Sequence, residues 1–107
     1  MSKYVLITGA SAGIGHEIAK EFAAKKFNLI LVARREERLS VISKDLAQKY
    51  NIEATYIVAD LSDPSSPQMI YNKTHALGLN VEILVNNAGT ALIKSFTQRM
   101  SWKKIIF

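Results

Sequence analysis

The sequence has 107 residues, no cysteine and a formal net charge of +5, with a pI near 9.6. This length suits one small domain, and the lack of cysteine excludes disulfides and thiolate metal sites. Hydrophobic residues make up 49% and charged residues 21%, a globular rather than a disordered balance. No apolar run approaches the roughly 20 residues of a membrane helix, and the run after Met1-Ser2-Lys3 is too short for a signal peptide. We therefore expect a soluble, cytoplasmic protein.

The positive charge is spread along the chain rather than gathered into one basic stretch. Most lysines and arginines alternate with Glu or Asp, as they do on solvated helix faces. The acid-free basic stretch is the tail, with Lys94, Arg99, Lys103 and Lys104. No nucleic-acid reading motif accompanies it, so we expect neither nucleic acid nor a membrane as partner.

The first half of the chain alternates apolar, β-rich runs with helical patterns. Tyr4–Thr8 predicts a buried strand that ends in a Gly-rich turn. Apolar residues four apart then predict a helix over Ile14–Lys26. Asn28–Ala33 predicts a second buried strand, and Arg35–Tyr50 a second helix.

The same alternation continues to the fourth strand. Glu53–Ala59 contains a third predicted strand. Ser66 is predicted as the N-cap of a third helix, which has proline at its first position and ends near Leu77 before Gly78. Val81–Val85 predicts a fourth strand. The resulting β-α-β-α-β-α-β order, with continuously apolar strands, predicts an α/β fold in which helices cover both faces of a parallel sheet.

The strongest motif is T-G-A-S-A-G-I-G, residues 8–15, between the first strand and the first helix. Gly9 allows a sharp turn, Gly13 lets the backbone approach a pyrophosphate, and Gly15 allows close packing of the helix. The helix N-terminus offers free N–H groups to an anion, and Ser11 can add a hydroxyl. The alternative is a tight strand-to-helix turn that binds nothing.

The glycine spacing resembles the cofactor signature of the short-chain dehydrogenase/reductase family, and two further motifs support this. Asn86-Asn87-Ala88-Gly89 follows the fourth strand, where that family carries N-N-A-G, and Asp60-Leu61 follows the third. The resemblance covers essentially the whole chain. It implies a Rossmann-type three-layer sandwich with a partial parallel sheet, a dinucleotide-binding half over residues 1–89 and the start of a truncated helical region over residues 90–107.

The end of the second strand predicts which nicotinamide cofactor binds. Ala33, rather than an acidic residue, lies about 20 residues beyond the glycines, where NAD-binding proteins place a carboxylate for the ribose. Arg34 and Arg35 follow, and the forked guanidinium of arginine suits a 2′-phosphate. We therefore expect NADP in preference to NAD, with Arg34 as the main contact. The alternative is a helix start in which Arg34 and Arg35 form salt bridges with Glu36 and Glu37.

The resemblance also assigns roles to residues beyond the second strand. It places Asp60 and the Leu61 N–H at the adenine and Asn87, Ala88 and Gly89 at the nicotinamide-side ribose, while Asn86 ties neighbouring strands together. The alternative for Asp60 is a cap of the following turn. The complete predicted set of cofactor-binding residues is Gly9, Ser11, Gly13, Ile14, Gly15, Arg34, Asp60, Leu61, Asn87, Ala88 and Gly89.

The family's catalytic residues have no counterpart here. No tyrosine is followed four positions later by lysine, so neither of these two residues can be carried over. The resemblance places the serine after the family's fifth strand, before which we expect this chain to end. No metal site is expected. His16 and His75 are interpreted as ordinary helix residues. The tail ending Ile105-Ile106-Phe107 is interpreted as an unfinished helix at a truncation, or as an unusual docking tail. We expect the fourth strand to be an exposed edge open to association.

Three functional hypotheses remain open. The chain is either an inactive N-terminal fragment of an NADP-dependent oxidoreductase, or a nucleotide-binding module completed by another chain. The third hypothesis is a basic interaction domain that works through the Trp102-containing tail.

Overall fold

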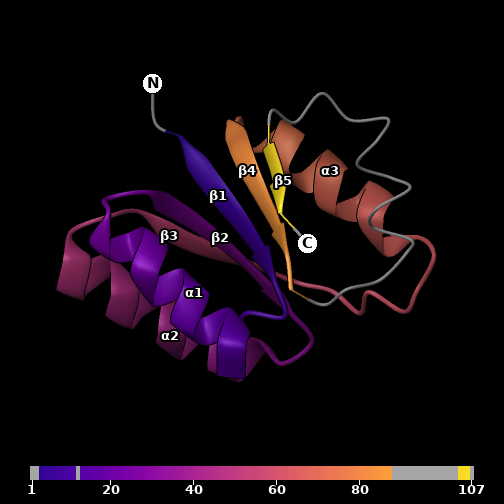
Figure 1. The fold of residues 1–107 in the computed structure, drawn as a ribbon. Helices are drawn as coiled ribbons and strands as arrows, with labels where there is room; N and C mark the ends of the chain where they lie inside the picture. Colours follow the sequence, from indigo (N-terminus) through magenta and orange to yellow (C-terminus); the bar gives the residue numbers. More distant parts are fainter. Residues whose placement is uncertain (1–2, 12, 88–103, 107) are drawn as a thin grey trace.

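The computed structural model describes residues 3–11, 13–87 and 104–106, the last three by their backbone alone. In this part of the chain, five parallel strands form one sheet in the order β3-β2-β1-β4-β5 (Figure 1). The elements are β1 (Tyr4–Thr8), α1 (Gly13–Ala24), β2 (Asn28–Ala33), α2 (Glu36–Tyr50), β3 (Ala54–Val58), α3 (Ser66–Ala76), β4 (Val81–Asn86) and β5 (Lys104–Ile106). The predicted α/β fold with a parallel sheet is confirmed.

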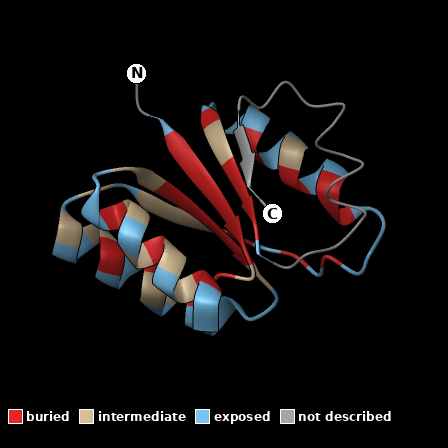
Figure 2. Cartoon of the chain, in the orientation of Figure 1, coloured by how far each residue is buried: buried red, intermediate tan, exposed pale blue. Residues whose placement is uncertain are grey.

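Strand β1 forms the centre of the core. All five of its residues are buried, and it pairs with β2 on one side and β4 on the other (Figure 2). Leu6 packs in a cluster with Ile70 of α3, whereas Ile7 packs in the opposite cluster with Ala19 of α1 and Leu39 of α2. Since neighbouring residues of a strand face opposite sides of the sheet, α3 covers one face and α1 and α2 cover the other. This is the predicted three-layer sandwich.

The C-terminal strand corrects two expectations. Residues 104–106 form a parallel strand whose register pairs Ile83 with Lys104 and Val85 with Ile106, so this segment is not helical. Strand β4 is therefore an interior strand, and the prediction that it forms an exposed edge is wrong. The physical reason is that two consecutive β-branched isoleucines favour extended backbone, and β4 offers them a row of unpaired backbone groups. The remaining residues of the predicted helical region, 88–103, lie outside the described residues.

The start of α3 differs by one residue from the prediction. Ser65 is the N-cap, Ser66 is the first helical residue and Pro67 the second. The Ser66 hydroxyl instead donates to the backbone carbonyl of Asp60, which anchors the helix start to the segment after β3. Proline is tolerated at this second position because the first N–H groups of a helix have no partner within the helix.

None of the helices in the described part of the chain is long and apolar enough to span a membrane.

Candidate functional site

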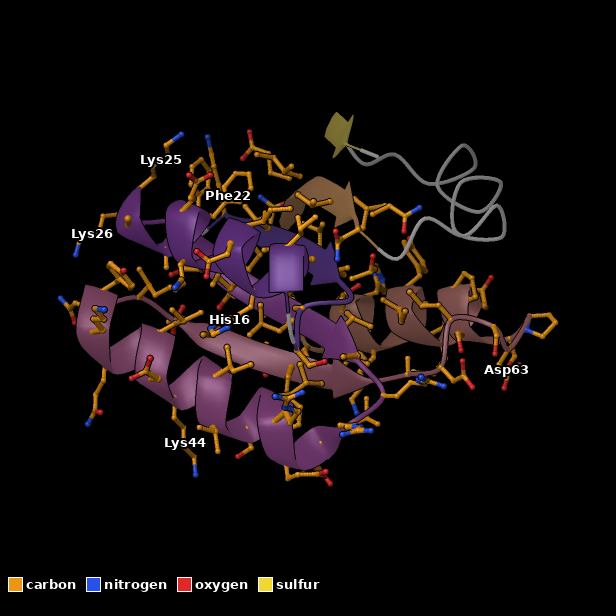
Figure 3. All side chains as sticks on the ribbon, turned by 60° about the horizontal axis from the view of Figure 1, so that its bottom comes forward. His16, Phe22, Lys25, Lys26, Lys44 and Asp63 are labelled. Atoms are coloured by element: carbon orange, nitrogen blue, oxygen red, sulfur yellow. The ribbon has the colours of Figure 1, made fainter. Side chains whose placement is uncertain are left out.

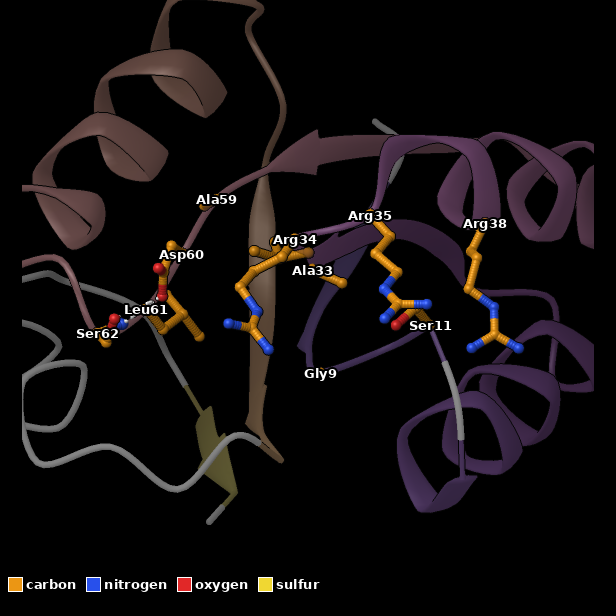
Figure 4. Close-up of a pocket in the computed structure, with 11 residues that line it drawn as sticks. Gly9, Ser11, Ala33, Arg34, Arg35, Arg38, Ala59, Asp60, Leu61 and Ser62 are labelled. Atoms are coloured by element: carbon orange, nitrogen blue, oxygen red, sulfur yellow. Dashed lines mark hydrogen bonds between the residues drawn. The ribbon is translucent and has the colours of Figure 1, made fainter.

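A cavity of about 400 Å³ lies at the carboxyl ends of β1, β2 and β3 (Figure 4). It brings together residues from three separate predicted motifs. They are Gly9 and Ser11 after β1, Ala33, Arg34 and Arg35 after β2, and Asp60 and Leu61 after β3. Ligands of open α/β sheets bind in this position, beyond the carboxyl ends of the strands. The sequence motifs therefore meet at one place, as the parallel topology requires.

The glycine turn has the geometry that its residues predict. Gly13 adopts a φ of +59°, and a Cβ added there would meet nothing within 4 Å. Gly15 is different, because a Cβ there would lie 2.0 Å from the carbonyl oxygen of Gly9 and 2.9 Å from the side-chain nitrogen of Asn87. Open space at Gly13 leaves room for a ligand beside the backbone, whereas Gly15 allows α1 to pack directly against the turn. The packing role predicted for Gly15 is confirmed.

The two asparagines at the end of β4 hold the neighbouring turn in place. The hydroxyl of Thr8 donates to Oδ1 of the buried Asn86 at 3.1 Å, which links β1 to β4. The side-chain amide of Asn87 donates to the carbonyl oxygen of Gly9 at 3.3 Å. The expectation that Asn86 ties adjacent strands together is confirmed. Ala88 and Gly89, which were predicted to contact the cofactor, lie outside the described residues.

Asp60 closes a turn at the edge of the cavity. Its Oδ1 accepts hydrogen bonds from the Ser62 hydroxyl at 2.7 Å and the Ser62 N–H at 3.0 Å. These two bonds, together with the positive charge of Arg34, hold the pKa of the Asp60 carboxyl below its ordinary value of 3.8. Asp60 is therefore ionised at neutral pH, and it makes the turn contact that was the alternative for this residue. Its predicted contact with adenine stays a prediction.

Among the described residues, the arginines around the cavity form no ion pair with an acidic side chain. In residues 3–11 and 13–87 the ion pairs are Lys3 with Glu82 and Lys20 with Glu17. Salt bridges from Arg34 or Arg35 to Glu36 or Glu37, the alternative for this helix start, are thus not formed in that part of the chain.

Sequence analysis missed a charged residue of the cavity wall. Arg38 lines the cavity together with Arg34 and Arg35, and Figure 4 shows its side chain extending from α2 beside that of Arg35. The signal was its spacing, because residues three apart lie on the same helix face. That spacing points to a common target only once the direction of α2 relative to the glycine turn is known.

The sequence profile of the short chain dehydrogenase family matches residues 3–106. The chain belongs to this family. Among its relatives, the very-long-chain 3-oxoacyl-CoA reductase of Candida glabrata is 43% identical over 88 residues, which cover 80% of this chain and 24% of the relative. The human inactive hydroxysteroid dehydrogenase-like protein 1 is 41% identical over 88 residues, covering 81% of this chain and 26% of that protein.

A solved structure agrees with both the family and the fold. The L-sorbose reductase of Gluconobacter frateurii, crystallised with NADPH and L-sorbose, superposes with a TM-score of 0.77 and 34% identity. The match covers 83% of this chain and 34% of the reductase. This short-chain dehydrogenase chain therefore has the family's Rossmann-type fold and spans about a quarter to a third of the length of these relatives.

Proposed function

We propose that this chain is the cofactor-binding part of an NADP-dependent oxidoreductase of the short-chain dehydrogenase/reductase type, and that it prefers NADP to NAD. The observation that carries the proposal is the end of β2. Small Ala33 occupies the position of a ribose-binding carboxylate, and Arg34 and Arg35 line the cavity directly after it. The 2′-phosphate of NADP meets guanidinium groups there, and no carboxylate at that position repels it. The NADPH bound to the L-sorbose reductase supports the same choice.

The residues around the cavity fit a dinucleotide in chemistry as well as in position. The open backbone at Gly13 and the N-terminus of α1 suit the pyrophosphate. Ser11 lies in the cavity wall, and the Ile14 side chain is 71% exposed beside the turn, so neither is consumed by the core. We assign the remaining contacts to Asp60 and the Leu61 N–H at the adenine, and to Asn87, Ala88 and Gly89 at the nicotinamide ribose. When bound, the nicotinamide supplies hydride transfer to or from a carbonyl or alcohol.

A second candidate function is nucleotide binding without turnover. The observation that favours it is in the sequence, where no tyrosine is followed four positions later by lysine. On this hypothesis the chain binds the cofactor but relies on further sequence, in the same or another chain, for acid/base chemistry. Incubating the chain with NADPH and a panel of ketones distinguishes the two functions. Only an oxidoreductase oxidises NADPH and thereby lowers its absorbance.

Cofactor binding is tested by titrating the purified chain with NADPH and with NADH, following cofactor fluorescence and thermal stability. We expect saturable binding that is tighter for NADPH, that is abolished by Gly13→Val and that loses its NADPH preference in Arg35→Asp. Lys44→Asp makes the same charge change on the exposed part of α2 away from the cavity (Figure 3) and serves as the matched control. Circular dichroism establishes that each variant is folded. Absence of binding to the folded chain would overturn the proposal.

A further inference from the structure

Two arginines on the first turn of α2 lie at positions that helix stability alone would assign to other residues. Arg35 is the N-cap residue, with φ −101° and ψ 106°, and its side chain makes no capping hydrogen bond. Arg38 is the third residue of the helix. Ser, Asp or Asn is favoured at the N-cap and Glu or Gln at the third position. Positive charge is moreover unfavourable near the positive end of the helix dipole.

The surroundings provide only partial compensation for this placement. Glu36 and Glu37 lie in the same turn, and the dipole favours them there. Neither is within ion-pair distance of Arg35 or Arg38 across the described residues, and Glu36 accepts a hydrogen bond from the Tyr56 hydroxyl at 3.2 Å. Within the described residues, neither an ion pair nor a capping hydrogen bond explains the two arginines at these positions. Residues that break a local stability rule in this way tend to serve a binding site.

Both arginines face the same side of α2 and reach the same cavity. They are three residues apart, and both line the cavity that also contains Ser11 of the glycine turn (Figure 4). Arg38 and Ser11 also line a neighbouring groove of about 460 Å³, where His16 of α1 and Glu37 are the other ionisable residues. Arg38 thus forms the wall between the two hollows, on the side of the cavity nearest the start of α1. Arg34 lies on the other side, near enough to Asp60 to lower its pKa.

We propose that Arg38 is a further specificity-determining residue, which binds the 2′-phosphate of NADP together with Arg35, while Arg34 serves the Asp60 side of the cavity. This inference rests on the proposed function and refines it, because sequence analysis assigned the main contact to Arg34. A phosphate monoester carries a charge of about −1.5 to −2 at pH 7 and has three terminal oxygens. Two guanidinium forks match that charge and geometry, whereas one leaves part of the charge unpaired.

The test uses two probes that contain only the adenosine part of the cofactor. Adenosine 2′,5′-bisphosphate carries the 2′-phosphate and AMP does not, and calorimetric titration of the chain with each gives the contribution of that phosphate. We expect Arg38→Ala to weaken binding of the bisphosphate about tenfold, which corresponds to the loss of roughly one charge-assisted contact. The affinity for AMP should change by less than about twofold. Arg38→Lys keeps the charge without the fork and should fall between Arg38→Ala and the unmodified chain. In the double variant Arg35→Ala/Arg38→Ala the two probes should bind equally.

Lys44→Ala is the matched control, because it removes one positive charge from the exposed face of the same helix outside the cavity. Should Arg38→Ala bind the bisphosphate as tightly as Lys44→Ala does, the role of Arg38 would be refuted while the proposed function stands. Failure of the unmodified, folded chain to bind either probe would overturn the proposed function itself. A thermal midpoint of Arg38→Ala well below that of the unmodified chain would identify Arg38 as a structural residue and also overturn the inference.

Discussion

The side-chain amide of Asn87 donates a hydrogen bond to the carbonyl oxygen of Gly9, at 3.3 Å, across 78 positions of the chain. This bond joins the end of β4 to the first residue of the glycine turn. Gly15 of α1 lies against both atoms, because a Cβ added to it would meet each of them within 3.0 Å. Three elements thus converge on one peptide carbonyl, and the shape of the turn depends on all three.

Replacing Asn87 by alanine should loosen this junction. The Gly9 carbonyl would lose a donor, and a bond of this kind contributes about 1 kcal/mol to the free energy of unfolding. Urea denaturation measures the loss. The control is Asn72→Ala, which removes an exposed hydrogen bond to Gln68 within α3 and should change stability by less than about 0.5 kcal/mol. Equal losses in the free energy of unfolding for the two substitutions would show that the Asn87 hydrogen bond stabilises the fold no more than an exposed one does.

The second and third glycines of the turn, Gly13 and Gly15, should respond very differently to substitution by alanine. In Gly15→Ala the new Cβ lies 2.0 Å from a backbone oxygen, so the turn or the helix must move, and we expect a loss of at least about 3 kcal/mol. Gly13→Ala places its Cβ in open space and adds only the strain of a φ of +59°, about 1 to 2 kcal/mol.

Urea denaturation of both variants, supported by the yield of soluble chain, checks the order. A Gly15→Ala variant as stable as Gly13→Ala would contradict the close packing of α1 on Gly9.

The parallel architecture was predictable because its signals are local. Continuous apolar runs define β1 and β2 with the bounds that the structure has, and the glycines between Thr8 and Gly15 identify the turn from spacing alone. Parallel strands then place the residues after β1, β2 and β3 at one edge of the sheet. The site therefore followed from topology once the strands were known.

The parts that sequence analysis missed depend on tertiary structure. Strand β5 has three residues, too few for a periodic pattern, and its extended backbone depends on pairing with β4. Arg38 joins the cavity only because of the direction in which α2 leaves β2. The Ser66 hydroxyl donates to the Asp60 carbonyl six residues away instead of capping the helix. Because Ser65 and Ser66 are adjacent, the sequence alone does not decide which of them is the N-cap residue.

The ionisation of Asp60 should report directly on its turn. The Ser62 hydroxyl is the largest cause of its lowered pKa, so Ser62→Ala should raise that pKa toward 3.8, as followed by NMR titration of the carboxyl carbon. Because the folded pKa lies below the unfolded one, the associated stability is present above about pH 3.8 and is lost as the pH falls through the folded value. The part of the stability difference between Ser62→Ala and the unmodified chain that comes from this ionisation should therefore vanish in strong acid.

Asp63 provides the control for this titration, since its pKa is lowered by the N–H and the hydroxyl of Ser65. Ser65→Ala should raise the pKa of Asp63 and leave that of Asp60 in place. An Asp60 carboxyl that titrates identically with and without the Ser62 hydroxyl would refute this assignment.

Arg35→Ser should make the unliganded chain more stable and the cofactor complex weaker. Serine is a favoured N-cap residue and removes a cation from the positive end of α2, which together raise the free energy of unfolding by about 1 kcal/mol. Loss of one guanidinium contact should weaken NADPH about tenfold. At a concentration of 100 times the Kd of the unmodified chain, NADPH then adds about 2.7 kcal/mol to that chain and about 1.4 kcal/mol to the variant. Without NADPH, the variant should therefore unfold at a higher temperature than the unmodified chain. With NADPH at this concentration, the two should unfold at about the same temperature.

Lys44→Ser, in the middle of α2, is the control: it should lose a little helix stability and keep the full stabilisation by NADPH. A variant at Arg35 that loses stability without ligand would mean that the arginine serves the fold, and its place at the N-cap would no longer support a phosphate site.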